Sequence, residues 1–124
     1  MNATTSLILI ACLFALTFAS GFWMWNTRKP VPGLKLNLHK FLALGALALS
    51  GVQVNALTRQ TRPGGAALAV IAAAGALFVL TIVTGGLVSL EKPMPGAVRW
   101  AHRAGPFLTL AAEAAGFYLL LSQG

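Results

Sequence analysis

The chain has 124 residues, of which 57% are hydrophobic and only 9% are charged. A soluble domain of this size could not bury so much apolar surface. The net charge of +7 does not indicate nucleic-acid binding, because all nine Lys and Arg residues lie in or beside three connecting segments, where membrane topology rules place them. The single cysteine, Cys12, excludes a disulfide framework and a Cys-rich metal site.

Long segments without charge divide the chain into four expected helices. Residues 1–27, 41–58 and 63–90 contain no Asp, Glu, Lys or Arg, and residues 104–124 contain only Glu113. Each segment reaches the roughly 18 residues needed to cross a bilayer. The first lacks the basic start of a signal peptide, so we interpret it as a helix. The predicted fold is an all-α membrane protein with four transmembrane helices, at about residues 4–25, 34–57, 66–90 and 97–121.

The basic residues are distributed unevenly among the connecting segments. Only Arg59 and Arg62 belong to the second segment. Because basic residues accumulate on the cytoplasmic side, we expect the first and third segments to be cytoplasmic and both termini to be outside, in a bacterial inner membrane. The first and third segments, with the helix starts that follow them, hold the other seven bases: Arg28, Lys29, Lys35, Lys40, Lys92, Arg99 and Arg103.

Two segments that begin 63 residues apart share a motif. Residues 29–33 and 92–96 both read Lys-Pro-x-Pro-Gly, and in each copy a histidine follows the glycine by six residues and precedes a base. At ordinary frequencies, four such matches at a given location have odds of roughly one in 10^5. The motif indicates a tandem duplication of a helical hairpin, with repeat 1 at about residues 1–61 and repeat 2 at about 62–124. Two spans per repeat predict halves of the same orientation, related by a pseudo-twofold axis along the membrane normal.

The duplication extends into the preceding helices. With one extra residue allowed before the motif, three residues of the first half match three of the second: Phe14, Thr17 and Gly21 against Phe78, Thr81 and Gly85.

His39 and His102 are the only histidines and occupy the same position in the two copies. We expect them at the same depth, one to two turns inside their helices. Imidazole inside a membrane helix is costly unless it faces the bundle interior and finds a partner. Two imidazoles facing one another across an axis suit one haem b bound at both axial positions. Such a ligand set leaves no open iron position, which favours electron transfer over oxygen chemistry.

Neighbouring residues suit the same cofactor. Gly21, and Gly85 or Gly86, would let a flat macrocycle approach the backbone near the depth of the histidines. Four bases flank the histidines and are placed to pair with two propionates: Lys35, Lys40, Arg99 and Arg103. Other interpretations of the histidines stay open: two chlorophyll-type pigments with one histidine each, another metal, or a structural role facing lipid headgroups.

The pattern resembles the small four-helix transmembrane b-type cytochromes. The resemblance rests on the dipeptides His39-Lys40 and His102-Arg103, which open alternate helices, and on Thr84-Gly85 near a helix end. It implies electron exchange with a quinone or a partner redox protein. The chain departs from the common two-haem pattern because it has no second histidine pair, so one haem near one surface would not by itself carry electrons across the membrane.

Glu113 is the only acid inside an expected span. It follows His102 by eleven residues, which places it about 20° away on the same helix face and some 16 Å further along. Thr109 shares this stripe, and Ser50 and Gln53 are expected at similar depth. An intramembrane carboxyl is a functional candidate by default, here as a proton relay or a docking residue, with hydrogen-bonded helix packing as the structural alternative.

The leading functional hypothesis is a membrane electron carrier with one haem b, which exchanges electrons with a quinone or a larger redox complex. The alternative is a non-catalytic accessory subunit of a respiratory or photosynthetic complex, which packs through small-residue faces such as residues 66–76 in an oligomer or hetero-complex. A transporter or channel ranks third, because membrane-embedded charge is nearly absent. Hydrolytic or transferase chemistry is not expected without a nucleophile, a carboxylate pair or a phosphate-binding loop.

Overall fold

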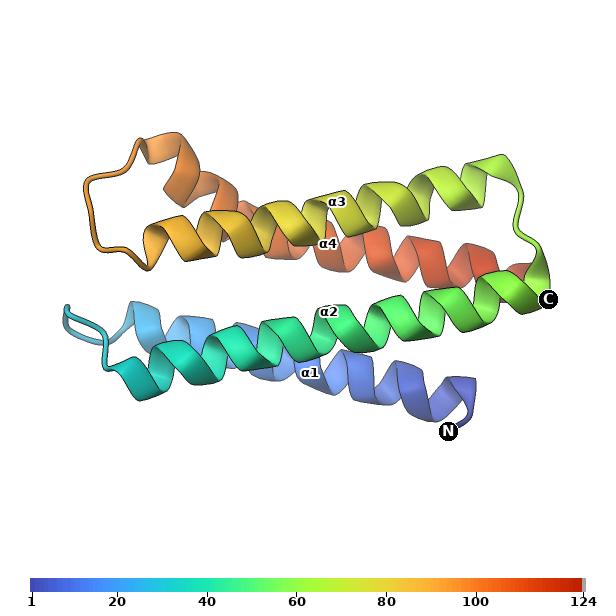
Figure 1. Cartoon of the computed structure of the whole chain (residues 1–124), viewed down its shortest axis with the longest axis horizontal. Helices are drawn as coiled ribbons and strands as arrows, with labels where there is room; N and C mark the ends of the chain where they lie inside the picture. The colour runs from blue at the N-terminus through green and yellow to red at the C-terminus, as the bar shows by residue number, and fades with distance from the viewer. Residues whose placement is uncertain (124) are drawn as a thin grey trace. The chain divides into compact units, whose positions relative to one another are not determined.

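The computed structural model describes residues 1–123 and contains four α-helices (Figure 1). They are α1 (Ala3–Trp25), α2 (Gly33–Thr61), α3 (Gly65–Val88) and α4 (Gly96–Ser122). The chain divides into two compact units, Met1–Gln53 and Val54–Gly124. The division falls inside α2.

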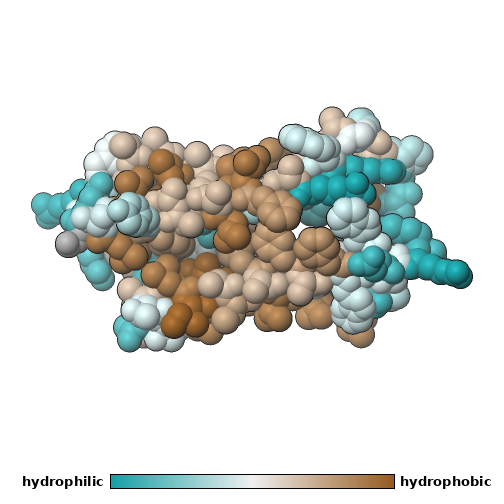
Figure 2. Space-filling model, turned by 180° about the vertical axis from the view of Figure 1, so that it is seen from behind, coloured by the Kyte–Doolittle hydropathy of each residue, from teal (hydrophilic) through white to brown (hydrophobic). Residues whose placement is uncertain are grey.

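All four helices are long and apolar enough to cross a membrane, with 23, 29, 24 and 27 residues. At about 1.5 Å per residue, even the shortest exceeds the roughly 30 Å of a bilayer's hydrocarbon core. Figure 2 shows hydrophobic residues over the middle of the helices and hydrophilic residues toward their ends. The prediction of an all-α fold with four membrane-length helices is confirmed.

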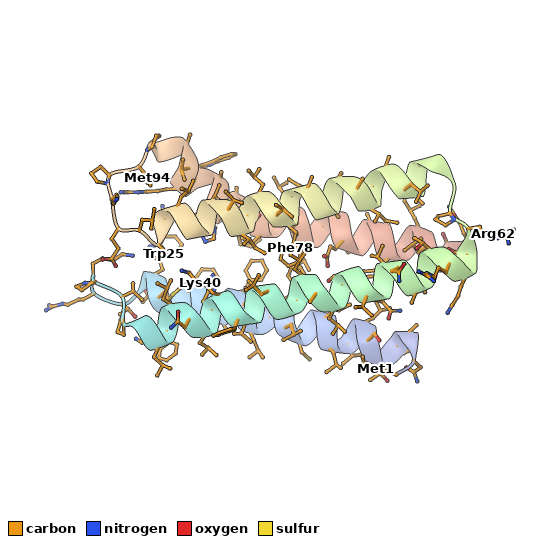
Figure 3. The ribbon with its side chains drawn as sticks, in the orientation of Figure 1. Met1, Trp25, Lys40, Arg62, Phe78 and Met94 are labelled. Carbon is orange, nitrogen blue, oxygen red and sulfur yellow. The ribbon has the colours of Figure 1, made fainter. Side chains whose placement is uncertain are left out.

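Unit 1 is a helical hairpin in which α1 and most of α2 run antiparallel (Figure 1). Asn2 caps α1, because its Oδ1 accepts a hydrogen bond from the backbone N–H of Thr5 at 2.8 Å. At the other end of the hairpin, Trp25 and Lys40 lie toward the loop that joins the two helices (Figure 3). Trp25 is exposed, as is typical of an indole at the level of the headgroups.

Unit 2 holds the end of α2 and the antiparallel pair α3 and α4, which pack along their length. Small residues permit close approach: a Cβ added at Gly116 would lie 3.4 Å from Ile71 Cγ1, and one at Gly105 would lie 2.5 Å from Thr81 Oγ1. Met94 and Arg62 mark the two opposite ends of this unit (Figure 3).

Helix α4 contains a proline in its interior, Pro106. Proline has no N–H and therefore cannot donate to the carbonyl four residues earlier, which is the carbonyl of His102. The first turns of α4 are inclined relative to the rest of the helix (Figure 1), as expected of a proline kink. The sequence predicted a continuous helix at about residues 97–121, and the bend at Pro106 differs from that prediction.

The two Lys-Pro-x-Pro-Gly motifs both begin a helix at their glycine, Gly33 for α2 and Gly96 for α4. The starts lie one residue before the predicted ones. Proline fixes φ and lacks an N–H, so the residue after the second proline is a natural first position of a helix. The motif thus serves as a shared start signal for the two helices that carry histidine.

Candidate cofactor site

His39 of unit 1 contacts α1 near the loop end of the hairpin. Its Nδ1 lies 2.8 Å from the hydroxyl oxygen of Ser20, and that hydroxyl also lies 2.9 Å from the carbonyl oxygen of Thr17. Ser20 is buried and His39 is half-buried. The imidazole is therefore tied to α1 by a chain of two hydrogen bonds.

One arrangement of the hydrogens makes both contacts of the Ser20 hydroxyl into hydrogen bonds. A serine hydroxyl has one hydrogen, and in this arrangement Ser20 donates it to the carbonyl oxygen of Thr17. The contact with the ring is then a hydrogen bond only if Nδ1 of His39 donates to Ser20 Oγ. In a neutral ring with its proton on Nδ1, the lone pair that can bind a metal is on Nε2.

His102 of unit 2 reaches the same tautomer by a shorter route. Its Nδ1 lies 3.0 Å from the carbonyl oxygen of Thr81. A carbonyl oxygen only accepts, so Nδ1–H donates and Nε2 again carries the lone pair of the neutral ring. Metal-binding histidines almost always donate their second N–H to a carbonyl, a carboxylate or water. His102 has this arrangement, whereas the ring of His39 contacts a hydroxyl.

Glycines lie against both imidazole rings. A Cβ added at Gly21 would lie 3.2 Å from Cε1 of His39, and one at Gly85 would lie 2.6 Å from Cε1 of His102. Nothing lies within 4 Å of a Cβ added at Gly86. At Gly21 and Gly85 the imidazole approaches the backbone in this structure, whereas the sequence led us to expect a flat macrocycle there.

The four flanking bases differ in their surroundings. Lys40, Arg99 and Arg103 are exposed, whereas Lys35 is half-buried. Its Nζ donates to Thr27 Oγ1 at 2.9 Å and lies 4.3 Å from the centre of a ring of Trp23. Lys35 thus ties the end of α1 to the start of α2, while the other three reach outward from the helix starts.

The polar residues deeper in the helices belong to different units. Ser50 and Gln53 are buried in unit 1, and Glu113 is half-buried in unit 2. One turn before Glu113, Thr109 is only 1% exposed, and its hydroxyl lies 3.4 Å from that of Thr81. The stripe of α4 that begins at His102 is therefore packed against α3 at Thr109.

Residues 1–123 contain no group of three or more His, Cys, Asp or Glu placed to hold a metal ion. A haem needs no such group, since the porphyrin supplies four nitrogens to the iron and the protein supplies only axial ligands. The residues that the sequence analysis missed are Ser20 and the acceptor carbonyls. A hydroxyl residue directly before each glycine, Ser20 before Gly21 and Thr84 before Gly85, was the available signal.

Comparison with family models, curated proteins and solved structures finds no match for this chain.

Proposed function

We propose that the protein is a membrane electron carrier that binds one haem b, with His39 of unit 1 and His102 of unit 2 as its axial ligands. The observation that carries the proposal is the paired geometry within the units: each imidazole packs on a glycine, and its Nδ1 contacts an oxygen of the preceding helix. In both rings the contact at Nδ1 makes Nε2 the nitrogen proposed as the ligand, and a second hydrogen bond of this kind typically orients a metal-binding histidine.

The burial pattern supports the proposed duplication. Buried residues of α1 recur in α3 at an offset of 64, as in Phe14 and Phe78 or Ser20 and Thr84. Buried residues of α2 recur in α4 at an offset of 63, as in Leu57 and Leu120. The change of offset by one agrees with the extra residue that the sequence alignment needed. We propose that the two units are equivalent hairpins related by a pseudo-twofold axis.

A haem in this site would supply a one-electron couple. The residues of the chain would hold it and set its charge environment: Nε2 of each histidine as ligand, and the exposed guanidinium groups of Arg99 and Arg103 and the ammonium of Lys40 as partners of the propionates. With one histidine pair near one end of the helices, the proposed exchange is with a quinone or with a larger redox complex at that surface.

An absorption spectrum of the purified protein, oxidised and then reduced, tests this proposal. Haem b with two histidine ligands gives sharp reduced bands that are lost in variants lacking either histidine. Bound chlorophyll-type pigment would instead support the alternative of an accessory subunit in a photosynthetic complex. A colourless protein that takes up neither haem nor pigment in reconstitution would overturn the proposed haem site and would leave the alternative of an accessory subunit without a cofactor.

We also propose that the loops 26–32 and 89–95 face the cytoplasm of a bacterial cell, because seven of the nine bases lie in or near them. Cysteines placed near Arg62 should then react with an impermeant thiol reagent from outside, and cysteines near Lys29 should not. The exposed native Cys12 must first be replaced. The reverse labelling would contradict this orientation.

A further inference from the structure

We infer that Ser20 is a positioning residue for His39, and that it fixes Nε2 as the ligand nitrogen by relaying the Nδ1–H hydrogen bond to the carbonyl of Thr17. The inference rests on the haem site proposed above. Ser20 would not itself be a ligand of the haem iron and would act through His39. Its basis is the pair of contacts at 2.8 and 2.9 Å that meet at one hydroxyl oxygen.

The second unit shows what the serine adds. Thr84 corresponds to Ser20 by the offset of 64, and its hydroxyl oxygen lies 2.9 Å from the carbonyl oxygen of Leu80 and 3.0 Å from that of Thr81. His102 donates to that same carbonyl of Thr81 at 3.0 Å. In unit 2 the hydroxyl and the imidazole therefore share one acceptor, and the imidazole does not depend on the hydroxyl.

The relay in unit 1 is different because Ser20 lies between the ring and the carbonyl. Without the hydroxyl, Nδ1 of His39 loses the acceptor that holds its proton, and the ring is left to exchange between its two tautomers. One tautomer has its lone pair on Nε2 and the other on Nδ1, which faces α1. A partner of this kind typically contributes about 10–100-fold to metal affinity, so Ser20→Ala is expected to weaken haem binding by about tenfold or more.

The experiment is nitrogen NMR of the metal-free full chain in detergent micelles, with isotope-labelled histidine. With only two histidines, His39→Leu and His102→Leu assign both rings. Both rings are expected as the Nδ1–H tautomer. Ser20→Ala should reduce the share of His39 in the Nδ1–H tautomer and leave His102 unchanged. Ser20→Thr, which keeps a hydroxyl, should keep His39 in the Nδ1–H tautomer. Thr84→Val should leave the tautomers of both rings unchanged.

Ser6→Ala is the matched control, because Ser6 is also buried on α1 and donates to the carbonyl of Asn2 far from the histidine. If Ser20→Ala leaves His39 in the Nδ1–H tautomer, or if Ser20→Thr does not keep it there, the relay is overturned.

A separate haem titration distinguishes the relay from the haem site. Wild-type protein that shows the expected tautomers but binds no haem would refute the haem site alone, whereas tight haem binding with an unchanged tautomer in Ser20→Ala would refute the relay alone.

Discussion

In unit 1 the imidazole of His39 reaches α1 through the hydroxyl of Ser20, whereas in unit 2 the imidazole of His102 reaches α3 directly at the carbonyl of Thr81. The spacing to glycine follows this difference. The added Cβ at Gly21 lies 3.2 Å from the ring, and that at Gly85 lies 2.6 Å from the ring. A hydrogen bond made directly to the backbone brings the ring closer to the helix than one made through a side chain.

The difference shows which features two hairpins must share to present equivalent histidines. The shared features are the glycine under the ring, the carbonyl one turn earlier at Thr17 or Thr81, and the contact of Nδ1 with the preceding helix. The side-chain hydroxyl is retained at both positions, but it bridges in one unit and shares the acceptor in the other. The backbone glycine and carbonyl are therefore common to the two histidines, and the side-chain hydroxyl accounts for the difference in the distance between the ring and the helix.

Replacing either histidine should have the largest effect and tests whether the two units contribute equally. His39→Leu and His102→Leu should each abolish haem retention, because one ligand is lost and leucine cannot replace it. Membrane insertion should persist, since the loss of a polar residue favours the embedded state. Absorption spectra of the membrane fraction measure retention. A single variant with full haem content and an unchanged spectrum would show that the replaced histidine is not an axial ligand.

Glycine substitutions should separate the units. Gly85→Ala places a methyl group 2.6 Å from Cε1 of His102, against 3.2 Å at Gly21, and overpacking of this kind typically costs about 1–3 kcal/mol. We expect haem affinity to fall about tenfold or more in Gly85→Ala and by less in Gly21→Ala. A haem titration measures both.

Gly86→Ala is the matched control for this pair, because nothing lies near its added Cβ. It should bind haem like the wild type, apart from any gain in helix propensity. An effect of Gly86→Ala equal to that of Gly85→Ala would show that the contact with the ring is not the cause.

The sequence was sufficient to predict the four helices, because charge-free runs of this length have few other folds. It was less accurate at their ends. Helix α2 continues to Thr61, four residues past the predicted end, because polar residues there leave the apolar run without breaking the helix: the hydroxyls of Thr58 and Thr61 donate to the carbonyls of Val54 and Leu57.

The end of α3 deviates in the opposite sense. It ends at Val88, two residues before the predicted Leu90. The N–H of Leu90 turns back to the carbonyl of Leu87, and Glu91 takes a positive φ of 55°, a conformation common just after a helix. The prediction extended the helix to Leu90 because the first charged residue, Glu91, comes only after it.

The candidate site was predictable in its histidines and glycines, because those residue types are rare or repeated in register. Its second hydrogen bonds were not. The acceptors at Thr17 and Thr81 are backbone carbonyls, which every residue has and no side-chain pattern marks. The use of Ser20 and the different use of Thr84 depend on distances of a few tenths of an ångström between helices, which residue spacing does not encode.

Neutralising the exposed bases should have a smaller effect, on the reduction potential. Arg99→Gln and Arg103→Gln each remove a positive charge near the proposed propionates, which favours the more positive ferric iron and lowers the potential. A solvent-screened pair is worth about 1 kcal/mol or less, and 59 mV corresponds to a tenfold change for one electron, so we expect decreases of a few tens of millivolts. A redox titration beside the wild type measures them, and a rise in potential would contradict the proposed placement of the propionates.

The smallest expected change in potential is that of Lys35→Gln, and it sharpens the comparison of the units. The ammonium of Lys35 already contacts Thr27 and the Trp23 ring, and at the corresponding position of unit 2 stands Val98, which carries no charge. We therefore expect Lys35→Gln to shift the potential less than Arg103→Gln.

Lys35→Gln should instead loosen the link between α1 and α2, because a cation–π contact of this kind contributes about 0.5–1 kcal/mol. Proteolysis at the loop 26–32 should become faster in Lys35→Gln, and Lys40→Gln, which removes an exposed base of the same unit, should leave it unchanged. Suppose that Lys35→Gln shifts the potential as much as Arg103→Gln and leaves proteolysis unchanged. Lys35 would then be a partner of the propionates and not a link between α1 and α2.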